Sequence, residues 1–577
     1  MAPDANRESA ILSSFWSRFR HQNPTHPIYS MAARGEVDLA TTVPIVCHGD
    51  EGRGAKRQAF MVVNFHGLLG RGTNPQRRWE KKCGIKPRYV RHNLSFRGHT
   101  FTNRFLFGCM PKHWYTGERE DVFDALMKAA AEEAEFLATT GVKDPHSGKT
   151  YRCMMLGICG DWPWLQKSGN LNRTFNHVQK RLTVRTPPAG VCHLCRAGQI
   201  DIPYEQIGTR RPLWMSTLNE QSPFSIPSPF QVIPHDTEKL AELWKFDMFH
   251  CYHLGVGRQF LGSYLALLSE IQEGNNVDER FENLSQSYFT WCRVAKRNAH
   301  LKKLSKETIT WPKTTVYPVG AWSKGDLTAS LMFFVENNFR NHDFSDQPLL
   351  KLSFEAAAAV NECLRICYSR PLFLTRTDAL LIANLGLRFL RRYDSLADLR
   401  MQENRALYII QPKGHAFHHL MMALLTSLEN QSAQFFMNPL AWSTQCDEDF
   451  VGRPSRLARR TKVGRLQVRR VIQRYLKGAY HQWIRYGYIR RKAKRWSMQH
   501  EHYTGHKFDF LCKLFTAVLT YSYAIYAMIW YIYPVFGSAD VSSGPGTGPR
   551  NALFTPKKSH AAGENEPDSN SWFQLQV

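Results

Sequence analysis

Short apolar runs, rich in β-branched and aromatic residues, alternate with glycine-rich and charged turns along the first part of the chain. Because these runs are too short for helices, they predict buried strands at 42–47, 59–65, 101–109 and 151–159. Apolar residues in the segment 119–139 fall on one face among Glu, Lys and Ala, as in an amphipathic helix. Three strands, a helix and a fourth strand together predict a compact α/β unit.

Beyond this unit the pattern becomes helical, after a stretch that is rich in loops. Prolines cluster between positions 187 and 234, which predicts an insertion or linker and not a regular layer. A mostly helical stretch is expected from 237 to about 298. Further helices are expected at 326–337, 353–368, 377–393 and 415–428.

These patterns divide the chain into seven segments. The first, 1–40, is polar and is expected to be irregular. The others are the first part of the α/β core (41–165), the insertion (166–310), a helical continuation with a third acid (311–450), a basic helical region (451–500), an uncharged hydrophobic helix (514–536) and a disordered polar tail (537–577).

The charge of the chain points to a polyanionic partner. Among 577 residues, 75 Lys and Arg against 49 Asp and Glu leave a net charge of +26. The segment 453–495 has sixteen Lys and Arg and no acid, with apolar residues at helical spacing. We expect this segment to bind DNA phosphates, with an anionic membrane surface as the alternative partner. A hydrophobic content of 43% excludes a wholly disordered chain.

Two aspartates are placed where strands one and four end. Asp50 and Asp161 each come just past the expected end of a strand, and these strands can lie side by side. The pair is then within reach of one divalent ion, although aspartates also commonly cap turns. Two Mg²⁺ ions about 4 Å apart, held by carboxylates, can catalyse phosphoryl transfer. The candidates for a third carboxylate are Asp326 and Glu448 or Asp449.

Cysteine and histidine pairs suggest a second metal site. The chain has 13 cysteines and no apolar leader at its start, so we expect thiols or metal ligands in a reducing compartment. Cys192 and Cys195 form a CxxC pair, and His250 and His253 share one face of an expected helix. Such a Cys₂His₂ set can bind zinc, the alternative being an unrelated turn and two helix histidines. The histidines at 415, 418 and 419 could face DNA or a metal, but they are interpreted as structural.

Several short motifs, taken in order, resemble the DDE transposase family. Gly157 to Pro163, Gly169-Asn170-Leu171 and the CxxC pair are similar to the pattern of CACTA-type transposases. Asp247 to His250 is similar to that family's Asp-x-Met-His element, with the Met one place early. Gly320 to Asp326 resembles the stretch of the V(D)J recombination-activating recombinase that contains its catalytic Glu, a position that falls at or beside Asp326 here.

The resemblance implies a ribonuclease-H-like core that is interrupted by a zinc-clipped, largely helical insertion. Asp50, Asp161 and Asp326 would hold Mg²⁺ and act in catalysis. The two cysteines, His250 and His253 would bind structural zinc. The implied activity is DNA strand cleavage by water followed by strand transfer. The protein would be nuclear, and a homo-oligomer is one of its implied states. An Asp at the position of the family's Glu leaves it open whether catalysis survives.

The segment 514–536 suggests another class of function. Its twenty-three residues contain no charge and are long enough to cross a bilayer of roughly 30 Å. The preceding basic block suits the cytoplasmic side of a single-pass anchor near the C-terminus. The alternative function is therefore a non-catalytic, membrane-tethered basic scaffold.

Overall fold

Five strands form one mixed sheet in the order β3-β2-β1-β5-β4. The strands are β1 (Thr42–Arg53), β2 (Ala59–Gly67), β3 (Arg104–Pro111), β4 (Val142–Lys143) and β5 (Thr150–Gly160). The first three pair antiparallel, and β5 lies parallel to β1 with Gly49 opposite Gly160. The four predicted strands are thus confirmed, and strands one and four are neighbours. The prediction that Asp50 lies past the end of its strand is wrong, because β1 continues to Arg53 in register with β2.

The structure is a computed structural model that describes residues 5–85, 92–117, 120–144, 147–175, 188–464 and 466–486. The hydrophobic segment 514–536, the tail 537–577 and the basic region after 486 lie outside the described residues. Within the described ranges, no helix is both long and apolar enough to cross a membrane.

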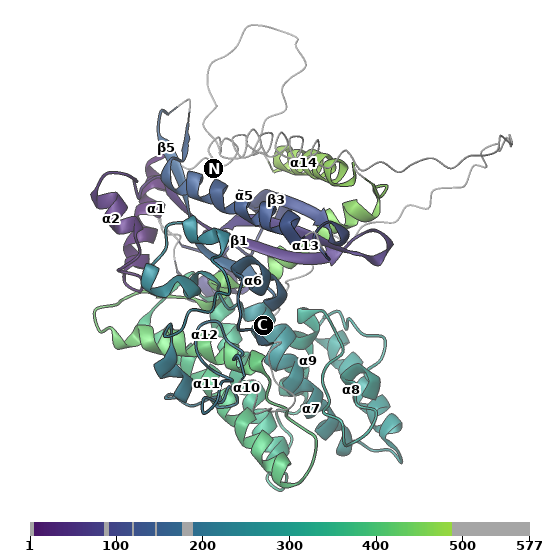
Figure 1. Cartoon of the computed structure of the whole chain (residues 1–577). Helices are drawn as coiled ribbons and strands as arrows, with labels where there is room; N and C mark the ends of the chain where they lie inside the picture. Colours follow the sequence, from purple (N-terminus) through teal and green to yellow (C-terminus); the bar gives the residue numbers. More distant parts are fainter. Residues whose placement is uncertain are drawn as a thin grey trace, which may run out of the picture.

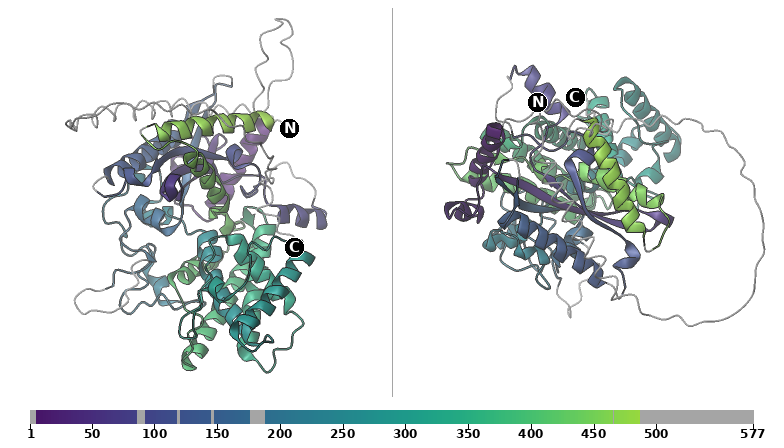
Figure 2. Two further views of the ribbon diagram at one scale, coloured as in Figure 1. Left: turned by 90° about the vertical axis from the view of Figure 1, so that its right-hand side faces the viewer. Right: turned by 90° about the horizontal axis from the view of Figure 1, so that it is seen from above.

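Helices cover both faces of the sheet (Figure 1). They are α5 (Glu120–Thr139) on one face, and α13 (Gln445–Arg459) and α14 (Gln467–Arg485) on the other. Alternation along β2 explains the division, because Met61 and Val63 join the core that contains α5, while Phe60 and Val62 pack against α13 and α14. Figure 2 shows α14 lying across the sheet. The apolar stripe predicted in the basic region is therefore the sheet-facing side of α14.

A helical part lies beside the sheet and shares its hydrophobic core (Figures 1 and 2). Its helices are α7 (Gly257–Glu270), α8 (Val277–Val294), α9 (Gly325–Asn338), α10 (Pro348–Ser369), α11 (Arg376–Gln402) and α12 (Pro412–Glu429). The helices predicted from 326, 353, 377 and 415 are confirmed, each somewhat longer than expected. The remaining short elements are α3 (Asn74–Lys82), α4 (Thr100–Asn103), α6 (Trp162–Gly169), β6 (Phe373–Leu374) and β7 (Phe436–Met437).

The first forty residues are not irregular. They contain α1 (Ala5–Arg20) and α2 (Ile28–Ala33). Phe15 and Trp16 of α1 are completely buried, and the Trp16 indole donates a hydrogen bond to the Thr42 carbonyl at 2.8 Å. The prediction was wrong because the apolar positions of α1 are few and lie among many polar residues, although their spacing is helical.

Candidate active site and metal centre

Three carboxylates from distant parts of the chain come together beside the sheet. Asp50 is on β1, Asp161 is the N-cap of α6, and Glu448 is in the first turn of α13. The Asp161 Oδ1 accepts a hydrogen bond from the Trp164 N–H at 2.8 Å, which fixes the start of α6. Burial raises the pKa of Asp50 well above its usual value, and the Glu448 and Asp161 carboxylates raise it further. The pairing of Gly49 with Gly160 puts Asp50 and Asp161 at neighbouring positions on adjacent strands, and Glu448 approaches Asp50 from α13.

Two glycines of β1 allow the helices to approach so closely. A Cβ atom at Gly49 would overlap the Trp164 ring of α6, and one at Gly52 would overlap the Ser455 hydroxyl of α13. Successive residues of a strand point to opposite faces, so Gly49 and Gly52, three positions apart, leave room for a helix on each face of β1. The sequence Gly-Asp-Glu-Gly therefore brings α6 and α13 to the two sides of Asp50.

The aspartate before Glu448 anchors α13 in the sheet. Asp447 has no exposed surface, and its carboxylate accepts hydrogen bonds from Asn64 Nδ2 at 2.8 Å and Arg104 Nη2 at 3.3 Å. His66 Nδ1 lies 3.0 Å from the same carboxylate. Burial alone would raise the pKa of Asp447, but Arg104 and His66 hold it far below its usual value. The hydrogen bonds of the ionised, buried Asp447 fix the start of α13, and this orients the next residue, Glu448, toward Asp50.

Two histidines flank the Glu448 carboxylate. His48 Nε2 lies 3.5 Å and His250 Nε2 lies 3.6 Å from the same oxygen, Glu448 Oε1. The other ring nitrogen of His250 is 2.5 Å from Asp247 Oδ2. Burial opposes ionisation of Glu448, but the contact with His48 and the charges of both histidines lower its pKa overall.

The same Asp247 joins two segments of the site. Its carboxylate accepts from the Phe249 N–H at 2.6 Å and from the Thr444 hydroxyl at 2.9 Å, just before α13. Asp247 therefore ties the π-helical turn Phe249–Val256, which contains His250, to the start of α13.

Asp326, the third acid inferred from the resemblance, lies elsewhere. It is in the first turn of α9, where its Oδ2 is 2.6 Å from His300 Nε2. The carboxylate that the structure brings to Asp50 is Glu448, which was one of the alternatives. Asp449 faces away to pair with Arg453 at 3.1 Å.

The carboxylates of this site are of the type that could bind a divalent cation. Burial raises the pKa of Asp50, and the charges of Glu448 and Asp161 raise it further. Glu448 Oε1 is buried and has no hydrogen-bond partner within the described part of the chain. Hard carboxylate oxygens are the ligands that Mg²⁺ and Mn²⁺ accept.

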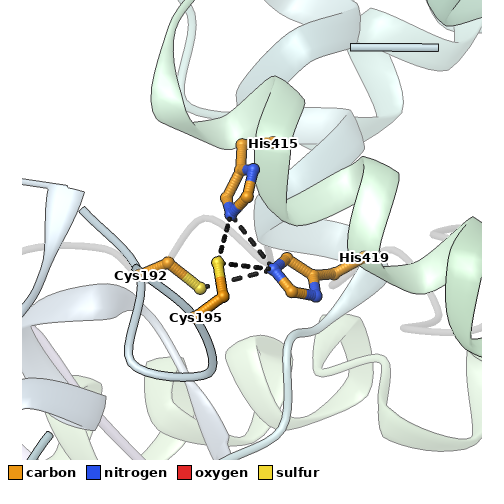
Figure 3. Close-up of side chains that lie close together, drawn as sticks. All are labelled: Cys192, Cys195, His415 and His419. Carbon is orange, nitrogen blue, oxygen red and sulfur yellow. Dashed lines mark hydrogen bonds between the residues drawn. The ribbon is translucent and has the colours of Figure 1, made fainter. Parts of the chain in front are cut away.

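A second group of ligands could hold a metal such as zinc. It consists of Cys192, Cys195, His415 and His419, all buried, whose ligand atoms lie within 4.8 Å of one another (Figure 3). Cys195 Sγ is 3.3 Å from His415 Nε2 and 3.4 Å from His419 Nε2. With zinc bonds of about 2.0–2.3 Å, tetrahedral ligand atoms stand roughly 3.3–3.8 Å apart. The spacing and the donor types both fit such an ion.

The two thiols differ in pKa, since burial and the neighbouring Cys192 raise the pKa of Cys195 well above its usual value. Burial raises the pKa of the Cys192 thiol, but Cys195 and the two histidines bring it well below its usual value overall. Burial and the neighbouring His419 lower the pKa of His415, which keeps its imidazole neutral. Thiolate and neutral imidazole are the forms that bind zinc.

The metal centre differs from the predicted one in its histidines. The two cysteines are as predicted, but His250 lies beside Asp247 and Glu448, and His253 Nε2 lies 3.5 Å from the Tyr368 hydroxyl. His415 and His419 take their place because α12 projects residues four apart from one face. The signal was present as a His-x₃-His spacing, and it was interpreted as structural.

Cations gather on the outer side of α13 and α14. The exposed ones include Arg456, Arg459, Arg460, Arg470, Lys477 and Arg485. Partial burial lowers the pKa of Arg456, and the charges of Arg453, Arg459 and Arg460 lower it further, against the charge of Asp449.

The sequence has no match among family models, and no curated protein matches it either.

Proposed function

We propose that this protein cleaves and joins DNA strands as a DDE-type transposase does, on a ribonuclease-H-like core. The observation behind the proposal is the convergence of Asp50, Asp161 and Glu448. They come from the first strand, from the end of the strand parallel to it, and from a helix that returns to the sheet nearly 300 residues later. The three antiparallel strands followed by a helix and a parallel strand support the same assignment.

The chemistry assigned to the site is phosphodiester hydrolysis followed by transesterification. In the first reaction a water oxygen bonds to phosphorus, the P–O3′ bond breaks, and the leaving oxygen takes up a proton to become a 3′-hydroxyl. In the second, the oxygen of this 3′-hydroxyl loses its proton and bonds to a phosphorus of another strand, while the P–O3′ bond of that strand breaks and its leaving O3′ takes up a proton. A bound pair of divalent cations supplies charge neutralisation of the attacking and leaving oxygens.

The chain's own residues prepare the site for this reaction. Asp50, Asp161 and Glu448 would hold the cations, and Asp447 and Asp247 fix the elements that carry them. Exposed arginines on α13, such as Arg456 and Arg459, would position the DNA backbone beside the acids.

We also propose that the Cys₂His₂ group holds a structural zinc ion. It connects the loop-rich insertion, through Cys192 and Cys195, to the first turns of α12. A metal clip is most useful there, because few regular elements hold the insertion in place.

The decisive experiment is a DNA nicking assay with Mg²⁺ or Mn²⁺. We expect the wild-type chain to cut, and Asp50→Asn, Asp161→Asn and Glu448→Gln each to lose at least about 100-fold in rate. Asp326→Asn is the matched control and should keep nearly full activity. Equal cutting by the wild type and Glu448→Gln would overturn the proposal.

A further inference from the structure

A buried histidine shares the face of β1 from which Asp50 projects. His48 is two residues before Asp50, and alternate residues of a strand point to the same face. Its side chain has no exposed surface. Helix α13 packs on this face, and the Oε1 atom of its Glu448 lies 3.5 Å from His48 Nε2.

Hydrogen bonding fixes which nitrogen of His48 carries a proton. The Asp447 carboxylate can only accept, so the Asn64 group 2.8 Å from it must be the amide NH₂. The Asn64 oxygen therefore faces His48 Nδ1, at 3.0 Å, and Nδ1 must donate to it. This leaves His48 Nε2 as the nitrogen that faces Glu448.

Two buried atoms thus face each other without a hydrogen bond. Within the described residues, neither His48 Nε2 nor Glu448 Oε1 has a hydrogen-bond partner, and 3.5 Å is at the limit of such a bond. Adjacent ligands of an octahedral ion with bonds of about 2.1 Å are roughly 3 Å apart, so the pair is close to the spacing of two ligands of one ion.

The electrostatic surroundings of His48 favour a cation. The Glu448 carboxylate lies 3.5 Å from His48 Nε2, and the Asp447 carboxylate is linked to His48 Nδ1 through Asn64. Carboxylates gathered around the imidazole in this way attract a metal ion.

We propose that His48 Nε2 is a ligand of the divalent cation held by Asp50 and Glu448, so that this site prefers Mn²⁺ to Mg²⁺. Imidazole is a ligand of first-row transition ions, whereas Mg²⁺ takes oxygen. The relay from Nδ1 through Asn64 to Asp447 is the arrangement that orients metal-binding histidines. The inference rests on the proposed cation site of the three carboxylates.

His250 is a weaker candidate for the same role. Its Nε2 is 3.6 Å from the same Glu448 oxygen, but its side chain is 14% exposed, so water can satisfy this nitrogen. His48 has no such access. The two histidines therefore make a matched pair of variants.

The test is electron spin echo spectroscopy of Mn²⁺ bound to the full chain after loading with one equivalent of Zn²⁺. We expect ¹⁴N modulation from a directly bound imidazole, changing to that of ¹⁵N when the protein is made with ¹⁵N-histidine. His48→Gln should abolish the nitrogen signal, and His250→Gln should keep it. Asn64→Ala should keep the signal but weaken Mn²⁺ binding roughly 10- to 100-fold.

The outcomes separate this inference from the proposed function. Mn²⁺ bound in an Asp50-dependent manner without nitrogen modulation would overturn the role of His48 and leave the carboxylate site standing. A nitrogen signal lost in His250→Gln would also overturn it. Failure of the wild type to bind Mn²⁺ would overturn both. If His48→Gln does not fold, two results still test the role of His48. They are the nitrogen signal of the ¹⁵N-histidine wild type and its retention in His250→Gln.

Discussion

At the scale of single residues, Asp447 and Asp449 show how differently two nearby carboxylates can act. Asp447 is enclosed and accepts from Arg104 and Asn64, whereas Asp449 is a quarter exposed and pairs with Arg453. We expect Asp447→Asn to lower the free energy of unfolding by about 3–5 kcal/mol, because Arg104 is left as an uncompensated buried charge. Asp449→Asn should cost less than about 1 kcal/mol. Urea unfolding followed by circular dichroism measures both, and equal costs would contradict this account of α13.

The identity of the site residues was only partly predictable from the sequence. Asp50 and Asp161 could be placed near each other because strands one and four of such a unit can lie side by side, as β1 and β5 do. Choosing Glu448 over Asp326 requires knowing where α13 returns to the sheet, and that depends on contacts such as Asn64 with Asp447, 383 positions apart. No local pattern reports such a contact. His415 and His419 were considered as metal-facing residues, but their spacing alone does not show that they meet the CxxC cysteines, which lie more than 200 positions earlier.

At the scale of elements, α1 is held by a histidine that must stay neutral. His92 is 2% exposed, and its Nε2 is 3.0 Å from the Ile11 carbonyl. Burial is the main reason that the pKa of His92 falls to about 4. The hydrogen bond with Ile11 raises this pKa, and the charge of Arg18 lowers it. The unfolded chain therefore binds the proton first as pH falls. The contribution to stability is complete above about pH 6.5 and is lost as pH falls toward 4.

This linkage predicts a measurable difference between pH 7 and pH 5. Over that interval His92 should account for a loss of about 2 kcal/mol in the free energy of unfolding. His92→Gln should remove this part of the pH dependence, while other buried neutral histidines such as His26 keep the rest. Urea unfolding at the two pH values is the measurement. An unchanged pH dependence in the variant would show that His92 does not hold α1 in this way.

Regular elements were predictable where packing agrees with local pattern. The strands and the long helices α5, α10, α11 and α12 each have an apolar face that is visible in the sequence. β1 was expected to end early because Gly49 to Arg53 has the composition of a turn. Pairing with β2 overrides this preference, as Asp50 stands opposite Val62 and Arg53 opposite Ala59.

The proposed zinc site also belongs to the scale of elements, since its metal ion would join the insertion to α12. Purified wild-type protein should contain about one zinc per chain by atomic absorption. Cys195→Ser should lose this zinc and unfold at a lower temperature, because a structural metal contributes its binding free energy to folding. Cys83→Ser, at an exposed cysteine, is the control and should change neither property. Zinc retained in Cys195→Ser would contradict the assignment of the ligands.

At the scale of the whole molecule, the proposed DNA-binding surface consists of the exposed cations of α13 and α14. Neutralising Arg470 and Lys477 of α14 together should reduce the slope of log affinity against log salt by about 2. The control is Lys302→Gln with Lys313→Gln, two exposed lysines of the helical part. Fluorescence anisotropy with a short duplex at several salt concentrations measures the slopes. If the slope changes more in the Lys302 and Lys313 variant than in the α14 variant, DNA does not bind at the α13 and α14 surface.

The central claim is that Asp50, Asp161 and Glu448 hold catalytic cations together. Anomalous diffraction from crystals of the full chain grown with Mn²⁺ tests it most directly. The account predicts Mn²⁺ peaks roughly 2 Å from carboxylate oxygens of these three residues. Peaks beside Asp326 and His300, or none near Asp50, would contradict it.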